Sequence, residues 1–147
     1  MEGIVVSHIR SSSPGYRQVW DLREEILRIP IGLSLKNEDL SGDWEDDIFI
    51  AKHNDQIIAC LMLHPIGKKQ VQFRQMAVCN EWQGKGVGKL LVVSAEKFCF
   101  DKGCRKIILH ARKVAVGFYE KLGYSISGNE FVEVGMAHYM REKPMPA

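Results

Sequence analysis

Residues Gln75–Phe98 read QMAVCNEWQGKGVGKLLVVSAEKF. A short apolar run is followed by a polar turn, by glycines at alternate positions and then by apolar residues at helical spacing, which predicts a strand, a loop and a helix. Glycines let the backbone turn sharply and expose its N–H groups, and a helix start adds unpaired amides and a partial positive charge. Lys85 and Lys89 add full positive charge. The segment therefore predicts a binding site for a phosphorylated ligand.

The glycine spacing differs from that of two common nucleotide-binding loops. A P-loop needs Ser or Thr after its Gly-Lys pair, whereas Gly88 and Lys89 are followed by Leu90. A dinucleotide-binding loop needs its third glycine one residue later than Gly88, and an acidic residue about 20 positions further on for a ribose hydroxyl. A nucleotide-binding protein of either kind is therefore disfavoured.

The pattern that fits is Gln-x-x-Gly-x-Gly, with Gln83, Gly86 and Gly88 at the fixed positions. Downstream, residues 115–124 read AVGFYEKLGY. In this order the two patterns resemble the acyl-CoA signature and the second signature of the GNAT superfamily of N-acetyltransferases. The resemblance extends over nearly the whole chain. It implies one GNAT domain over residues 1–147, an α/β fold whose mixed, mostly antiparallel central sheet has a splayed strand pair and flanking helices.

The remaining sequence predicts elements in a compatible order. Residues 31–46 form a polar connection with room for a short helix, and 53–56 read as a hairpin turn. Antiparallel strands followed by a β-α-β crossover would give a mixed sheet. Strands are expected at 4–9, 48–51, 57–63, 70–78 and 106–109, with two more within 124–141, and helices at 11–29, 87–102 and 113–122.

The resemblance implies acetyl-CoA as the acyl donor. Its pyrophosphate would lie on the loop amides, and its pantetheine arm along the strand edge at 75–78. Many family members have Asn at the position of Arg112, so Arg112 is a departure that could reach a cofactor phosphate, an anionic substrate or a surface partner. The implied cofactor-binding residues are Met76, Ala77, Val78, Gln83, Gly84, Lys85, Gly86, Val87, Gly88, Lys89, Ala115 and Phe118, the last also expected in the core.

The resemblance also implies catalytic residues. Tyr119 matches the position at which many members present a phenol to the CoA sulfur, so it is the leading candidate for the general acid, with packing as its alternative role. Members often have a catalytic glutamate on the central strand, but QVQFRQMAV at 70–78 has no carboxylate. His110 and His138 are the candidates for the general base, because imidazole titrates near pH 6.5, although structural histidines are commoner.

The acceptor is left open by the sequence. In this fold the first helix and the following loop usually line the acceptor pocket. Arginines there would favour an anionic acceptor, and aspartates would favour an amine or polyamine. The expected function is transfer of an acetyl group from acetyl-CoA to a primary amine of a small molecule; the alternative is a non-catalytic acyl-CoA-binding or sensing module. The candidate acceptor contacts are Arg23, Arg28, Asn37, Asp43, Trp44, Asp46 and Arg74.

Composition excludes several other classes. The net charge of +2 gives no reason to expect nucleic acid as a partner. No apolar run approaches the ~20 residues of a membrane span, and the first residues lack the apolar centre of a signal peptide. The four cysteines lack metal-site spacing, so we expect reduced thiols, no metal and a cytoplasmic protein. Cys99 and Cys104 are not expected to face each other, and a homodimer through the last strands is allowed.

Overall fold

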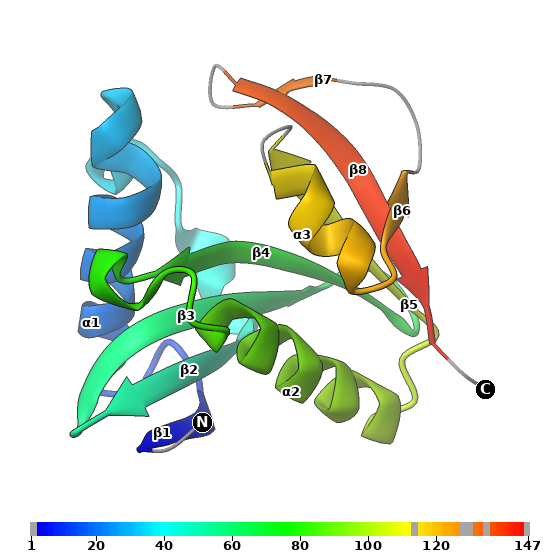
Figure 1. Cartoon of the computed structure of the whole chain (residues 1–147), viewed down its shortest axis with the longest axis horizontal. Coiled ribbons are helices and arrows are strands. Elements are labelled where there is room, and N and C mark those ends of the chain that lie inside the picture. Colours follow the sequence, from blue (N-terminus) through cyan, green and yellow to red (C-terminus); the bar gives the residue numbers. More distant parts are fainter. Residues whose placement is uncertain (1–2, 113–114, 127–130, 134–135, 146–147) are drawn as a thin grey trace.

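The computed structural model describes residues 3–112, 115–126, 131–133 and 136–145 of the 147-residue chain (Figure 1). Its strands are β1 (Ile4–Ile9), β2 (Asp47–His53), β3 (Gln56–Pro65), β4 (Gln70–Val78), β5 (Lys106–Arg112), β6 (Ser125–Ile126), β7 (Phe131–Glu133) and β8 (Met136–Pro144). Its α-helices are α1 (Tyr16–Arg23), α2 (Val87–Asp101) and α3 (Val116–Lys121). The shorter helical turns are the π-helical η1 (Glu24–Arg28) and the 3-10 turns η2 (Ile29–Ile31), η3 (Leu35–Asn37), η4 (Ser41–Glu45) and η5 (Asn80–Trp82).

The strands form one mixed sheet in the order β1-β2-β3-β4-β5-β8-β6, with β7 paired to β8. All described pairs are antiparallel except β4 with β5, which are parallel. The β2–β3 hairpin turns at Asn54 and Asp55, whose φ angles of 50° and 63° are the positive values that a tight hairpin turn needs. The expected mixed, mostly antiparallel α/β fold is therefore confirmed.

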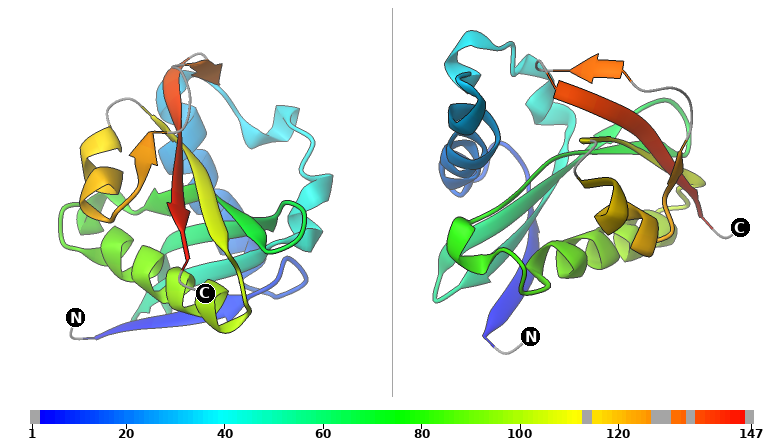
Figure 2. Two further views of the ribbon diagram at one scale, coloured as in Figure 1. Left: turned by 90° about the vertical axis from the view of Figure 1, so that its right-hand side faces the viewer. Right: turned by 45° about the horizontal axis from the view of Figure 1, so that its top comes forward.

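The parallel strands β4 and β5 pair over only part of their length. Their register runs from Gln70 opposite Lys106 to Phe73 opposite Leu109, although β4 continues to Val78 and β5 to Arg112. The strands are therefore splayed beyond Phe73 among the described residues. In Figures 1 and 2, β4 converges with β8, the neighbour of β5, at one end only.

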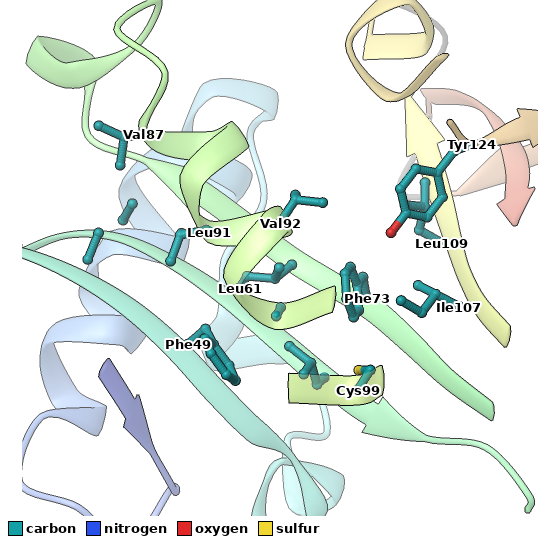
Figure 3. Packing of buried hydrophobic residues seen from close by; sticks show 14 of the residues in the cluster. Phe49, Leu61, Phe73, Val87, Leu91, Val92, Cys99, Ile107, Leu109 and Tyr124 are labelled. Atoms are coloured by element: carbon teal, nitrogen blue, oxygen red, sulfur yellow. The ribbon is translucent and has the colours of Figure 1, made fainter. Parts of the chain in front are cut away.

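Helices cover both faces of the sheet, with α1 and α2 on opposite sides of β2–β4 (Figure 2). Apolar residues of α2 recur every three or four positions, so one side of the helix is buried against the sheet. In Figure 3, Phe49, Leu61 and Phe73 of the sheet lie beneath α2. The α2 core contains Val87, Leu91, Val92, Ala95 and Cys99, and the α1 core contains Val19, Leu22, Ile48, Ile50, Cys60 and Met62.

The first helical segment differs from the single helix expected over 11–29. Regular α-helix ends at Arg23 and continues as a π turn, in which the Ile29 N–H donates to the Glu24 carbonyl, and then as a 3-10 turn containing Pro30. In a regular α-helix, the side chains of residues i and i+5 point about 140° apart around the helix axis. A π turn has i→i+5 hydrogen bonds, so residues i and i+5 lie on nearly the same side of the helix. Arg23 and Arg28 are thereby both buried on the sheet side.

The carboxyl-terminal part has two further differences. The helix expected at 113–122 is observed as Val116–Lys121, with residues 113–114 outside the described ones. The tail forms three strands, β6, β7 and β8, where two were expected within 124–141. The resulting long β8 pairs with β5, β6 and β7, and thereby completes the sheet beyond the splayed strands.

Cys99 and Cys104 lie on either side of the carboxyl end of α2. The Cys104 N–H donates to the Cys99 carbonyl at 2.9 Å, and the Gly103 N–H donates to the Phe100 carbonyl at 3.0 Å. This pair of bonds is a Schellman motif, in which Gly103 at φ 83° turns the chain back over the end of α2. The buried Cys104 thiol donates to the Lys106 carbonyl at 3.3 Å, and all four cysteines of the chain are free.

Candidate active site

The glycine-rich loop ends directly in the amino terminus of α2. Gly86 is the N-cap residue, and its φ of 87° is a left-handed conformation that glycine adopts without strain. The first helical hydrogen bond runs from the Leu90 N–H to the Gly86 carbonyl at 3.0 Å. The amides of residues 87–89 precede that bond, and the first turn of α2 has no acidic residue. This helix start therefore has the geometry and the polarity of an anion-binding site.

Gln83 joins the loop to the end of β4. Its side-chain Nε2 donates to the Val78 carbonyl at 2.9 Å and to Oδ1 of Asn80 at 3.2 Å. The amide thus closes the turn through η5, which separates the strand from the helix. The Gln83 side chain orders the loop from within, and the backbone amides that follow it remain available to a ligand.

The two lysines of the loop are exposed beside the helix start. Nζ of Lys85 lies 5.2 Å from the ring centroid of Trp82, a cation–π contact that keeps this charge close to the loop. Val87, by contrast, is fully buried in the α2 core. Lys85 and Lys89 can attract an anion, whereas Val87 can reach one only through its backbone amide.

Predicted cofactor-binding residues from β4, α2 and α3 meet beside this loop. A methyl group built on Gly88 would lie 3.5 Å from Cζ of Phe118 and 3.7 Å from Cε of Met76. The strand, the loop helix and α3 are therefore in contact where the sequence predicted one cofactor site. Ala115 is the N-cap residue of α3, and Ala77 and Val78 lie in β4 opposite Cys60 and Ala59 of β3.

Tyr119 lies in the same cluster, next to Phe118. The two rings pack edge to face with centroids 4.9 Å apart, and the Tyr124 ring lies 6.0 Å from Tyr119. Burial raises the pKa of Tyr119 to about 12. The phenol is therefore protonated throughout the neutral range and has a proton to donate, and its ring also contributes to packing.

The predicted histidines lie on the two strands beyond the splay. In the β5–β8 ladder His110 is opposite Met140 and Arg112 is opposite His138. This confirms that the strand containing His138 packs against the strand containing His110. The side chains of Arg112 and His138 are outside the described part of the structure.

A buried network of charged residues lies on the α1 side of the sheet, and no sequence pattern predicted it. Asp43 accepts hydrogen bonds from Nη1 of Arg23 at 2.9 Å and from Nη2 of Arg74 at 3.1 Å. Asp46 pairs with Nε of Arg74 at 2.9 Å and with Nδ1 of His64 at 2.6 Å. Burial raises the pKa of Asp46, although both partners oppose that shift. The network joins α1, η4, β3 and β4, so it fixes the loop at 31–46 against the sheet.

This network changes the interpretation of the candidate acceptor contacts. Arg23, Asp43, Asp46 and Arg74 neutralise one another, so neither a purely anionic nor a purely cationic wall is formed. Arg28 is likewise paired, through Nε and Nη2, with the Glu38 carboxylate at 2.6 and 3.1 Å. Asn37 and Trp44 are exposed, Trp44 by 67%.

Neither a cluster of metal-ligand side chains nor a helix that could span a membrane occurs among the described residues. No group of three or more His, Cys, Asp or Glu side chains there is arranged to hold a metal ion. None of the described helices has both the length and the hydropathy needed to span a bilayer.

Comparison with known proteins gives a consistent result. The family model described as "Acetyltransferase (GNAT) family" matches residues 12–124, which include the glycine loop and Tyr119. The uncharacterized protein YyaT of Bacillus subtilis is 28% identical over 128 residues, covering 81% of this chain and 86% of YyaT.

Solved structures share the fold at low sequence identity. ElaA of Escherichia coli matches with a TM-score of 0.84 at 17% identity, over 95% of this chain and 99% of ElaA. A GNAT family acetyltransferase from Elizabethkingia anophelis, solved with acetyl-CoA bound, matches with a TM-score of 0.75 at 18% identity, over 99% of this chain and 100% of that one. At these identities the likeness shows the architecture alone.

Proposed function

Because this chain belongs to the acetyltransferase (GNAT) family, we propose that it transfers the acetyl group of acetyl-CoA to a primary amine of a small molecule. The observation that supports this most directly is the meeting of Gly88, Met76 and Phe118. It brings an anion-binding helix start, the edge of a splayed strand and the neighbour of a buried phenol into one site.

The described residues fit the donor. The amides of residues 87–89 would hold the pyrophosphate, with Lys85 and Lys89 adding charge. A side chain added at Gly86 would meet nothing within 4 Å, so the backbone is accessible there. The pantetheine arm would lie along β4 beyond Phe73, where β5 no longer pairs with it.

The thioester supplies an acyl carbon that the free amine of the acceptor can attack. A bond forms from nitrogen to that carbon, the carbon–sulfur bond breaks, the sulfur keeps the electron pair and the nitrogen loses a proton. The backbone amide of Met76 would donate to the acyl oxygen as negative charge develops on it. Removal of such a donor in other enzymes costs about 3–4 kcal/mol of transition-state stabilisation.

Tyr119 would donate to the sulfur that leaves. Its pKa of about 12 exceeds the value of about 8.5 for a free thiol, so complete proton transfer would be uphill by about 5 kcal/mol. We therefore assign to the phenol a hydrogen bond that stabilises the developing thiolate. The alternative role of Tyr119 as a packing residue would leave turnover unaffected when the hydroxyl alone is removed.

The proton acceptor for the amine is proposed among the histidines. His110 and His138 remain candidates for the general base, as the sequence analysis predicted. His64 joins them, because an Nδ1–H donated to Asp46 would leave the Nε2 lone pair of His64 available to a proton.

The test is release of CoA thiol from acetyl-CoA in the presence of amines, amino acids, aminosugar phosphates and polyamines. Release with one acceptor class is expected, and its charge identifies the polarity of the acceptor pocket. Acetyl-CoA binding without release across the panel would favour the alternative, a non-catalytic acyl-CoA-binding or sensing module. Failure of acetyl-CoA at millimolar concentration to raise the melting temperature would overturn the proposal.

A further inference from the structure

Gln75 interrupts β4 at the point where the strand leaves β5. Its φ of 55° is left-handed, which is uncommon for a residue with a side chain. The β3–β4 register shifts at the same point: Cys60 is opposite Ala77, but Met62 is opposite Arg74. Leu61 therefore faces Gln75 and Met76 together, which is the pattern of a β-bulge.

The unusual conformation of Gln75 is supported by three contacts on the α1 side of the sheet. Its side-chain Oε1 accepts from Nε of Arg23 at 3.4 Å and from Nη2 of Arg28 at 3.5 Å. Its main-chain carbonyl accepts from the Cys60 thiol at 3.5 Å. Both the side-chain amide and the main-chain carbonyl of Gln75 are therefore held by hydrogen bonds.

The two arginines are themselves held in place. Arg23 is 1% exposed and pairs with Asp43, and Arg28 is 6% exposed and pairs with Glu38 through two of its nitrogens. The π turn η1 brings these side chains, five residues apart, to the same side of the helix. A regular α-helix would direct them about 140° apart, so only one could face Gln75.

The bulge lies next to the backbone that the proposed reaction uses. Met76 follows Gln75 directly, and its side chain contacts the space above Gly88. A bulge removes its extra residue from regular pairing and changes the direction of the neighbouring peptide groups. The orientation of the Met76 amide therefore depends on the conformation of Gln75.

We propose that Arg23 and Arg28 are positioning residues that act through the Gln75 side chain, holding the bulge so that the Met76 amide is directed at the thioester oxygen. This inference rests on the proposed function. It goes further in assigning a role to two buried arginines, which pair with Asp43 and Glu38.

The test uses the difference between acetyl-CoA and CoA, because only acetyl-CoA has the oxygen that the Met76 amide would bind. Dissociation constants of both ligands are measured for the wild-type chain and for the variant Gln75→Gly. Glycine tolerates the left-handed φ but lacks the side-chain amide that accepts from the two arginines. We expect wild type to prefer acetyl-CoA by about fivefold, the usual effect of one hydrogen bond. Gln75→Gly is expected to lose that preference while its CoA affinity stays within about twofold of wild type.

Two further variants separate positioning from folding. Gln75→Glu retains an acceptor for both guanidinium groups and should keep the preference, whereas Gln75→Asn is one methylene shorter and should lose it. Melting temperatures identify any variant that does not fold. The inference is overturned if Gln75→Gly and Gln75→Asn both keep the wild-type preference, or if wild type binds acetyl-CoA and CoA equally. Either result would leave the proposed function standing. Wild-type protein that binds neither ligand would overturn the proposed function as well.

Discussion

Gly88 lies against the ring of Phe118: a methyl group at Gly88 would be 3.5 Å from Cζ of that ring. The contact joins the amino-terminal turn of α2 to α3, which belong to two separate sequence patterns. Because 3.5 Å is ordinary van der Waals contact, the protein itself can accommodate a methyl group there. In the proposed donor site, the same methyl group would stand between the Gly88 amide and the pyrophosphate.

Gly88→Ala should therefore affect stability and binding in opposite directions. Alanine inside a helix is more stable than glycine by about 1 kcal/mol, so the free energy of unfolding should be unchanged or slightly increased. Affinity for acetyl-CoA should fall at least about tenfold, because the pyrophosphate loses close approach to the backbone. Chemical denaturation and calorimetric titration of one preparation check both results. Unchanged affinity would contradict the assignment of this loop.

Gly86→Ala should instead lower both quantities. The φ of 87° at Gly86 is strained for alanine, although no atom lies within 4 Å of the added methyl group. The cost is purely conformational and should be about 1–2 kcal/mol of the free energy of unfolding. Acetyl-CoA affinity should fall because the helix start is displaced. A variant as stable as wild type would show that the loop has another conformation in solution.

Tyr119→Phe should lower the turnover number about a hundredfold with an accepted amine, while the dissociation constant of acetyl-CoA stays within about twofold. The ring that packs against Phe118 is retained, so only the hydroxyl that would hydrogen-bond to the sulfur is lost. Tyr124→Phe is the matched control, because the Tyr124 hydroxyl donates to Glu96 at 2.8 Å. That control should lose about 1 kcal/mol of stability and keep its turnover number. Equal turnover by Tyr119→Phe and wild type would assign Tyr119 to packing.

Asp43→Asn should destabilise the fold by about 3 kcal/mol, because it leaves the buried Arg23 guanidinium without its counter-charge. Asp21→Asn is the control. Asp21 pairs with Arg17 on the exposed side of α1, with side-chain exposures of 57% and 75%, and its loss should cost less than about 0.5 kcal/mol. Urea unfolding compares the two. Equal effects would mean that the buried network adds no more stability than a surface ion pair.

Glu24 should make stability depend on acid pH. Its carboxylate accepts from the Ser34 hydroxyl at 2.6 Å and from the Leu35 N–H at 2.9 Å, and these bonds lower its pKa from 4.5. The unfolded chain then binds the proton more readily than the folded one. The contribution is present in full above about pH 4.5 and is lost as the pH falls through the folded pKa. Urea midpoints of wild type and Glu24→Gln should differ at pH 7 and converge once the pH has fallen through the lowered pKa of Glu24. A constant difference would exclude this linkage.

The order of the elements and the position of the glycine loop could be predicted from the sequence. β4 is observed at the predicted bounds, Gln70–Val78, and α2 begins at Val87 as expected. These features depend on local properties: the period of apolar residues and the φ values that glycine permits. The same reasoning missed the π turn at Glu24–Arg28, because its apolar pattern is almost that of an α-helix.

The sequence by itself determined the family, the fold and the position of the glycine loop, because short-range spacing specifies each of them. Only the tertiary structure decided which charges face each other: Asp46 meets His64, 18 positions away, and Arg23 meets Gln75, 52 positions away. Spacing along the chain contains no information about such pairs. They form because packing brings distant polar groups into one water-excluded space, where each must find a partner.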